Sequence, residues 1–178
     1  MKRRTLLSFL TTLPCLTGLS LLTGLLLTAS PALASGFSVT LAPNDPALSC
    51  HAPTTPALSF GTPPAGTKAF AVIFWDQQPG KLTGRWTVYD LPLGTSGLAP
   101  AAAGGLNIAG GKVGTNEAGQ PGFTAPCATG RHELYVDFYA LNVASLNLPA
   151  GTPLQTVHAA IKAHKILEAK AHVTLIVK

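Results

Sequence analysis

Four polar residues near the ends of apolar segments could form a binding site: Asp76, Arg85, His132 and His51. An Arg beside a His can bind a phosphate or carboxylate, because the guanidinium group offers a planar set of donors. Each residue also has an ordinary structural interpretation. Asp76 could cap a turn, Arg85 could lie on the surface, and His132 could sit at the edge of a strand. The residues by themselves leave both interpretations open.

His132 belongs to the most distinctive stretch of the chain, residues 121–140. A loop rich in Gly and Pro leads to Cys127, and Arg131 and His132 then begin an aromatic segment. A rigid turn followed by a strand holds polar side chains in place, and loops anchored on sheets often carry binding groups. We therefore expect this stretch to contribute to a site.

Standard catalytic and metal-binding patterns are missing from the sequence. It contains no Gly-x-Ser-x-Gly motif, no His-Glu-x-x-His pair and no phosphate-binding loop before a Lys. Cys50, Cys127 and His132 lack the short paired spacing of metal ligands. No nucleophile, base and orienting group are placed together. We therefore expect a binding protein rather than an enzyme, with no metal and no cofactor.

The beginning of the chain has the pattern of an export signal. Residues 2–4 are Lys-Arg-Arg, residues 6–29 are mostly apolar, and residues 32–34 are Ala-Leu-Ala, which suits a signal peptidase. The two adjacent Arg residues also fit a loose twin-arginine pattern. An uncleaved membrane anchor is the alternative, because the apolar run approaches the thickness of a bilayer.

We therefore predict a signal peptide over residues 1–34, cleaved after Ala34, and a single domain over residues 35–178. The protein would be periplasmic or secreted. The chain has 12 Lys and Arg residues against 7 Asp and Glu residues, but three of the basic residues lie in the signal peptide. The remaining chain is close to neutral, so its charge gives no support for nucleic-acid binding, which needs a clustered basic face, and we expect no nucleic-acid partner.

Two cysteines remain after Ala34, Cys50 and Cys127. In an exported protein, two cysteines can form one disulfide. The bridge would close a long loop and stabilise the protein by on the order of 4 kcal/mol in the chain-entropy model. The alternative is two buried free thiols, and composition and compartment do not decide between them.

Hydrophobic periodicity predicts a mostly β domain with one late helix, arranged as an antiparallel or mixed sheet. Residues 76–81 have the composition of a turn, and residues 93–125 read as a long loop rich in Gly, Ala and Pro. We expect a helix over residues 156–170, because apolar residues recur there at helical spacing. The expected strands cover residues 37–41, 57–60, 68–75, 85–91, 132–141 and 171–177.

Several ordered segments together resemble the phosphatidylethanolamine-binding protein family, in particular its bacterial branch of Raf kinase inhibitor-like proteins. Residues 53–60 and 62–71 are similar to the family's Ser-Pro-Pro-Leu-Ser-Trp segment and the strand after it. Residues 116–139 are similar to its Gly-Pro-Cys loop and His-bearing strand. The helix with His164 and the strand after it fit the family's closing elements.

The resemblance implies a β-sandwich-like fold with a C-terminal helix, a final strand and a small surface pocket. In the family this pocket accepts phosphate, phospholipid head groups or carboxylates, and members act as binding proteins, scaffolds or inhibitors of proteases or kinases. By position, the resemblance assigns Asp76, Trp86 and His132 to the pocket.

The chain departs from the family's pattern at the pocket itself. Gln78 stands where a second carboxylate is expected, and Arg85 replaces the His before Trp86. Losing a carboxylate and gaining an Arg makes the site more positive. An altered anion site and a pocket filled by the long Arg side chain are both consistent with this. We expect an exported protein that binds a small anion or a phospholipid head group, and alternatively a protease inhibitor acting through residues 93–125.

Overall fold

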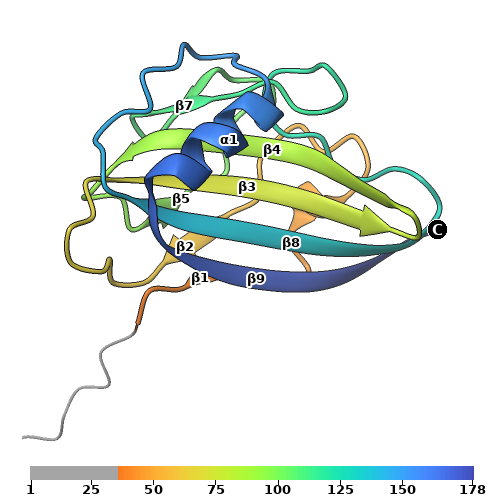
Figure 1. The fold of residues 1–178 in the computed structure, drawn as a ribbon. Helices are drawn as coiled ribbons and strands as arrows, with labels where there is room; N and C mark the ends of the chain where they lie inside the picture. Colours follow the sequence, from red (N-terminus) through yellow and green to blue (C-terminus); the bar gives the residue numbers. More distant parts are fainter. Residues whose placement is uncertain (1–35) are drawn as a thin grey trace, which may run out of the picture. The chain divides into compact units, whose positions relative to one another are not determined.

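The computed structural model describes residues 36–178, and all structural statements below concern that part of the chain. The expected signal peptide and its cleavage site lie outside the described residues. Two antiparallel sheets and one helix form three layers (Figure 1). Figure 1 shows helix α1 in front of the larger sheet, over β3 and β4, with the smaller sheet behind it.

The larger sheet has six strands in the order β6-β7-β4-β3-β8-β9. Every neighbouring pair is antiparallel. The expectation of a mostly β fold is therefore confirmed. The strands cover Ala69–Gln78 (β3), Lys81–Pro92 (β4), Asn107–Ile108 (β6), Gly111–Val113 (β7), Gly130–Leu141 (β8) and Lys165–Val177 (β9).

Strand β3 lies inside the larger sheet and is covered on both faces. Its residues from Ala69 to Asp76 are all buried, which agrees with the continuous apolar run in the sequence. Phe70, Val72 and Phe74 face the smaller sheet, whereas Ile73 belongs to the core beneath α1. The strand is thus a wall shared by two separate cores.

The smaller sheet has three strands in the order β1-β2-β5 and packs over one face of the larger sheet. Aromatic rings fill the space between the sheets, with Phe60 and Phe138 stacked at a centroid distance of 4.1 Å. The strands are short, and a turn of 3₁₀ helix (η1) links the first two. Their bounds are Val39–Leu41 (β1), Pro46–Leu48 (η1), Leu58–Phe60 (β2) and Gly97–Leu98 (β5).

Helix α1, Leu154–His164, covers the other face of the larger sheet. Leu154, Val157 and Ile161 are buried at helical spacing and pack against residues of β3, β4 and β8. Within residues 36–178, no helix is long and apolar enough to span a membrane.

The helix is shorter than the sequence predicts, and the expected range of 156–170 is wrong at both ends. It ends at His164, and β9 begins at Lys165 and not at residue 171. Strand β8 extends to Leu141, which pairs with Lys165. Pairing along β8 outweighs the weak helical periodicity of these residues. Leu167 would lie on the apolar face of a helix over residues 156–170, but in β9 it is 46% exposed.

The expected turn over residues 76–81 is also shorter. Strand β3 continues through Asp76 to Gln78, which pairs with Lys81 across a two-residue loop. Only Pro79 and Gly80 make the turn, and Gly80 takes a positive φ of 74°, as the glycine after a proline does in a type II turn. Asp76 therefore lies inside a strand and does not cap a turn.

Candidate functional site

Three predicted site residues, Asp76, Arg85 and His132, meet beside the loop over residues 123–129, on the face of β3 that also carries Phe74. The Asp76 side chain is fully buried, and its Oδ2 accepts hydrogen bonds from Arg85 Nη2 at 2.6 Å and Nε at 3.0 Å. Its Oδ1 lies 2.8 Å from His132 Nδ1. A buried carboxylate is stable only when it is paired and hydrogen-bonded. Asp76 meets both conditions, so it holds the guanidinium group of Arg85 and the ring of His132 in fixed positions.

Arg85 reaches Asp76 because of a β-bulge in β4. Phe74 pairs with Trp86 and Trp75 pairs with Gly84, so Arg85 is an extra residue without a partner on β3. A bulge re-aims the side chain of the extra residue. Gly84 in turn faces the helix, where a Cβ atom would come within 2.6 Å of Leu154 Cδ1. Strict alternation along β4 would have placed Arg85 on the helix face instead.

His132 is completely buried on β8, directly behind the loop that precedes the strand. Its Nε2 lies 2.7 Å from the carbonyl oxygen of Ala128. A carbonyl oxygen only accepts, so Nε2 carries a proton and donates it. Nδ1 faces a carboxylate oxygen of Asp76, so in the imidazolium form both ring nitrogens donate to acceptors. His132 ties the 123–129 loop to Asp76 and lies beneath the surface.

Trp86, assigned to the pocket by the resemblance, is also fully buried. It belongs to the core between the sheets, and its ring meets that of Phe123 edge to face at 5.9 Å. Its indole Nε1 has no hydrogen-bond partner among residues 36–178. Trp86 therefore supports the site from below through Phe123 and does not reach its surface.

Arg85 opens onto a cavity of about 470 Å³, which we call the Arg85 pocket. The basic side chains at its surface are Arg85, Lys81 and His51, and none of its lining residues carries a carboxylate. Gln78, Phe123 and Thr124 complete most of the lining. The pocket is small, open and positively charged, which is the chemistry that an anionic group needs.

A disulfide between Cys50 and Cys127 closes one side of the Arg85 pocket, with the two Cα atoms 4.8 Å apart. Of the two alternatives, the structure therefore contains the disulfide and not the two free thiols. The bridge joins the turn before His51 to the loop before Ala128, and both segments line the pocket. It therefore holds together two walls that come from distant parts of the sequence.

The structure brings three of the predicted site residues together, Asp76, Arg85 and His132, and His51 lies nearby. Their role in binding stays a prediction. Lys81 was missed, although the Pro79-Gly80 hairpin that pairs it with Gln78 was a usable signal. The expected loop over residues 93–125 contains three short strands, β5, β6 and β7. Protease inhibition through this loop stays a prediction.

Comparison with known proteins places this chain in a family. A UPF0098 protein of Aquifex aeolicus is 33% identical over 124 residues, which are 67% of this chain and 71% of the relative. A UPF0098 protein of Methanothermobacter thermautotrophicus is 30% identical over 119 residues, 65% of this chain and 78% of the relative.

Two solved structures share the fold. CT736 of Chlamydia trachomatis, a putative phosphatidylethanolamine-binding protein homolog, aligns with a TM-score of 0.69 and 26% identity over 81% of this chain and 99% of its own. YbcL of E. coli, described as a member of the mammalian PEBP family, aligns with a TM-score of 0.68 and 24% identity over 80% of this chain and 99% of its own. A sequence profile of the family described as "Phosphatidylethanolamine-binding protein" matches residues 33–176. The chain therefore belongs to the phosphatidylethanolamine-binding protein family.

Proposed function

We propose that this protein, after export, binds a small molecule through its anionic group in the Arg85 pocket, without catalysing a reaction on it. The observation that carries the proposal is the pocket's lining: Lys81, Arg85 and His51 surround it, and no carboxylate does. The family is named after phosphatidylethanolamine, a phospholipid with an anionic phosphate. The Arg85 pocket has the opposite charge to a phosphate, although its residues differ from the family's pattern.

Arg85 is suited to receive the anion because it is already oriented. Asp76 uses the Nε and Nη2 atoms of the guanidinium group, and the side chain remains 16% exposed. Three of its five N–H donors have no partner among residues 36–178. A guanidinium group held in place loses little conformational entropy when it binds an anion.

Lys81 adds a positive charge at the surface of the Arg85 pocket. Asp76 balances the charge of Arg85, whereas the ammonium group of Lys81 has no ion-pair partner among residues 36–178. The ligand's negative group would lie beside Arg85 and Lys81, with Phe123 and Thr124 beneath it.

Titration of the protein with inorganic phosphate and with a short-chain phosphatidylethanolamine, followed by NMR, tests this proposal. We expect saturable shifts at the His132 ring and at the amides of Arg85 and Ala128. Lys81→Gln should weaken binding about 5-fold, as expected for one exposed charge. Lys68→Gln is the matched control, since Lys68 is exposed and lies outside the pocket.

The two ligands separate the sources of the anionic group. Equal shifts with both would identify the phosphate itself as the recognised group, and tighter binding of the lipid would show that its glycerol or acyl part contributes. The absence of shifts at millimolar concentrations of both ligands would overturn the proposal.

A further inference from the structure

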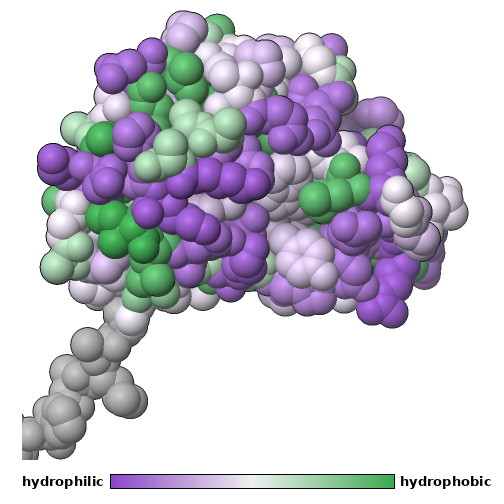
Figure 2. All heavy atoms as spheres, viewed as in Figure 1, coloured by the Kyte–Doolittle hydropathy of each residue, from purple (hydrophilic) through white to green (hydrophobic). Residues whose placement is uncertain are grey.

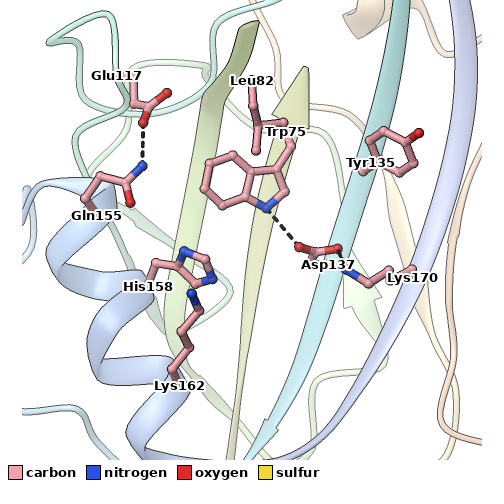
Figure 3. Close-up of a pocket in the computed structure, with 9 residues that line it drawn as sticks. All are labelled: Trp75, Leu82, Glu117, Tyr135, Asp137, Gln155, His158, Lys162 and Lys170. Carbon is pink, nitrogen blue, oxygen red and sulfur yellow. Dashed lines mark hydrogen bonds and ion pairs between the residues drawn. The ribbon is translucent and has the colours of Figure 1, made fainter. Parts of the chain in front are cut away.

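We propose a second binding site on the opposite face of the larger sheet, suited to a small aromatic carboxylate. The site is a cavity of about 500 Å³ between α1 and the sheet, which we call the Trp75 pocket (Figure 3). Its volume lies within the roughly 300–1,000 Å³ range of small-molecule sites. It is independent of the proposed function, because Trp75 and Asp76 point to opposite faces of β3.

Aromatic rings form the floor of the Trp75 pocket. Trp75 on β3 pairs with Tyr135 on β8, which pairs in turn with His172 on β9. His172 stacks on Tyr135 at a centroid distance of 4.7 Å and so supports that ring from its outer side. The His158 ring of α1 approaches Trp75 at 5.3 Å. These rings offer flat, rigid surfaces against which an aromatic ligand can pack.

The carboxylate in the floor of the pocket is already fully engaged. Asp137 Oδ2 accepts hydrogen bonds from Trp75 Nε1 at 2.9 Å and from the Tyr139 hydroxyl at 3.1 Å. Its Oδ1 accepts from Lys170 Nζ at 2.8 Å. Burial and the nearby Asp137 carboxylate raise the pKa of Tyr139, so its hydroxyl stays protonated and donates. Asp137 therefore fixes the rings and leaves little charge to interact with a ligand.

One cation of the Trp75 pocket is available for a ligand. Lys170 is paired with both Asp137 and Glu168. Lys162 also lines the pocket, and its ammonium group has no ion-pair partner among residues 36–178. A ligand carboxylate can therefore supply the missing partner for Lys162.

The two ends of the Trp75 pocket carry different polar groups along α1. Gln155, His158 and Lys162 lie on one side of α1 and line the pocket along about two turns. Figure 3 shows Glu117 beside Gln155 at one end and Lys162 at the other. Both oxygens of Glu117 are occupied, by the Gly84 N–H and by Gln155. The negative end of a ligand should therefore point toward Lys162, with its ring over Trp75.

The surface around the Trp75 pocket is partly apolar. Figure 2 shows pale and hydrophobic surface between the mostly hydrophilic side chains of α1 and the neighbouring part of the sheet. Leu82, which is 52% exposed, lines the pocket above Trp75 and adds apolar wall. A rigid ring fits this surface better than a flexible acyl chain, because the aromatic walls are themselves flat and fixed.

Fluorescence can test the inference, because the chain has only two tryptophans, and Trp86 is buried between the sheets on the other side. The probes are phenylacetate and its neutral counterpart phenylacetamide. We expect phenylacetate to change Trp75 fluorescence saturably at millimolar or lower concentrations, and phenylacetamide to bind about 5-fold more weakly. Amide shifts in NMR should map to His158 and Lys162 and not to Arg85.

Variants of the exposed residues Lys162 and Lys68 keep the test independent of folding. Lys162→Gln should reduce phenylacetate binding to the level of phenylacetamide, Lys162→Arg should restore most of it, and Lys68→Gln should change nothing. Tyr135→Ala should weaken both probes, since it removes a wall of the pocket. The inference is overturned if neither probe binds saturably, if Lys162→Gln binds phenylacetate as well as the unchanged protein, or if the shifts map to the Arg85 pocket.

Discussion

The two pockets lie on opposite faces of one sheet, and each is built over a buried carboxylate. Asp76 lies under the Arg85 pocket and Asp137 under the Trp75 pocket. Asp76 is held by two groups that are themselves largely buried, Arg85 and His132. Asp137 is held by two neutral donors and by Lys170, whose side chain is 60% exposed. Asp76 therefore positions Arg85 and His132, whereas Asp137 positions the rings of Trp75 and Tyr139.

This difference can be tested by removing one carboxylate at a time. Asp76→Asn should destabilise the protein by about 3–5 kcal/mol, because it leaves the largely buried guanidinium group of Arg85 without its counter-charge. Asp137→Asn should cost about 1–2 kcal/mol, because its remaining oxygen can accept from Trp75 and Tyr139 while Lys170 turns to water. Urea unfolding measures both. Equal losses would contradict the distinction between the two sites.

Removing the disulfide should affect only one pocket. The double variant Cys50→Ser, Cys127→Ser should lower the free energy of unfolding by about 2–4 kcal/mol. Phosphate binding should weaken several-fold, since the bridge joins two walls of the Arg85 pocket, while phenylacetate binding should be unchanged. Parallel titrations of the two ligands check this. A loss of phenylacetate binding of similar size would show that the pockets are coupled.

The smallest expected effect is a pH dependence beside the Trp75 pocket. Hydrogen bonds from Thr174, Arg131 and His172 lower the pKa of Glu133 to about 2. Because the pKa is lower in the folded state, Glu133 contributes stability above its usual pKa near 4.5, and this contribution is lost as the pH falls toward about 2. Urea midpoints at about pH 5 and about pH 3 should differ less in Glu133→Gln than in the unchanged protein. An identical pH dependence of the two proteins would show that Glu133 does not contribute to the pH dependence of stability.

The central strands could be predicted from the sequence because buried positions are occupied by apolar residues. The apolar run of β3 and the alternation of β8, with Leu134 and Val136 on one face and Tyr135 on the other, both agree with the structure. The boundary between α1 and β9 could not be predicted. It depends on the length of β8, a partner distant in sequence, and not on local propensity.

The sites were harder to predict because their groups converge from separate segments. The position of Arg85 depends on a bulge that alternation does not reveal. The Trp75 pocket escaped notice entirely, since its lining comes from β3, β4, β8, β9, α1 and the segment after β7. His158 of α1 lines it, and burial and the nearby Lys162 lower the pKa of this side chain. None of these residues forms a local motif.

The bulge at Arg85 also decides which pocket receives each residue of the β3–β4 hairpin. Because β4 contains one extra residue, Lys81 pairs with Gln78 and both line the Arg85 pocket, while Leu82 turns to the Trp75 pocket. If β4 continued in regular alternation through Arg85, Leu82 would pair with Gln78 and each residue from Leu82 to Arg85 would face the opposite side of the sheet, since side chains alternate with a period of two. Leu82 would then face the Arg85 pocket and Lys81 would lie in the turn, so one bulge determines the lining of both pockets.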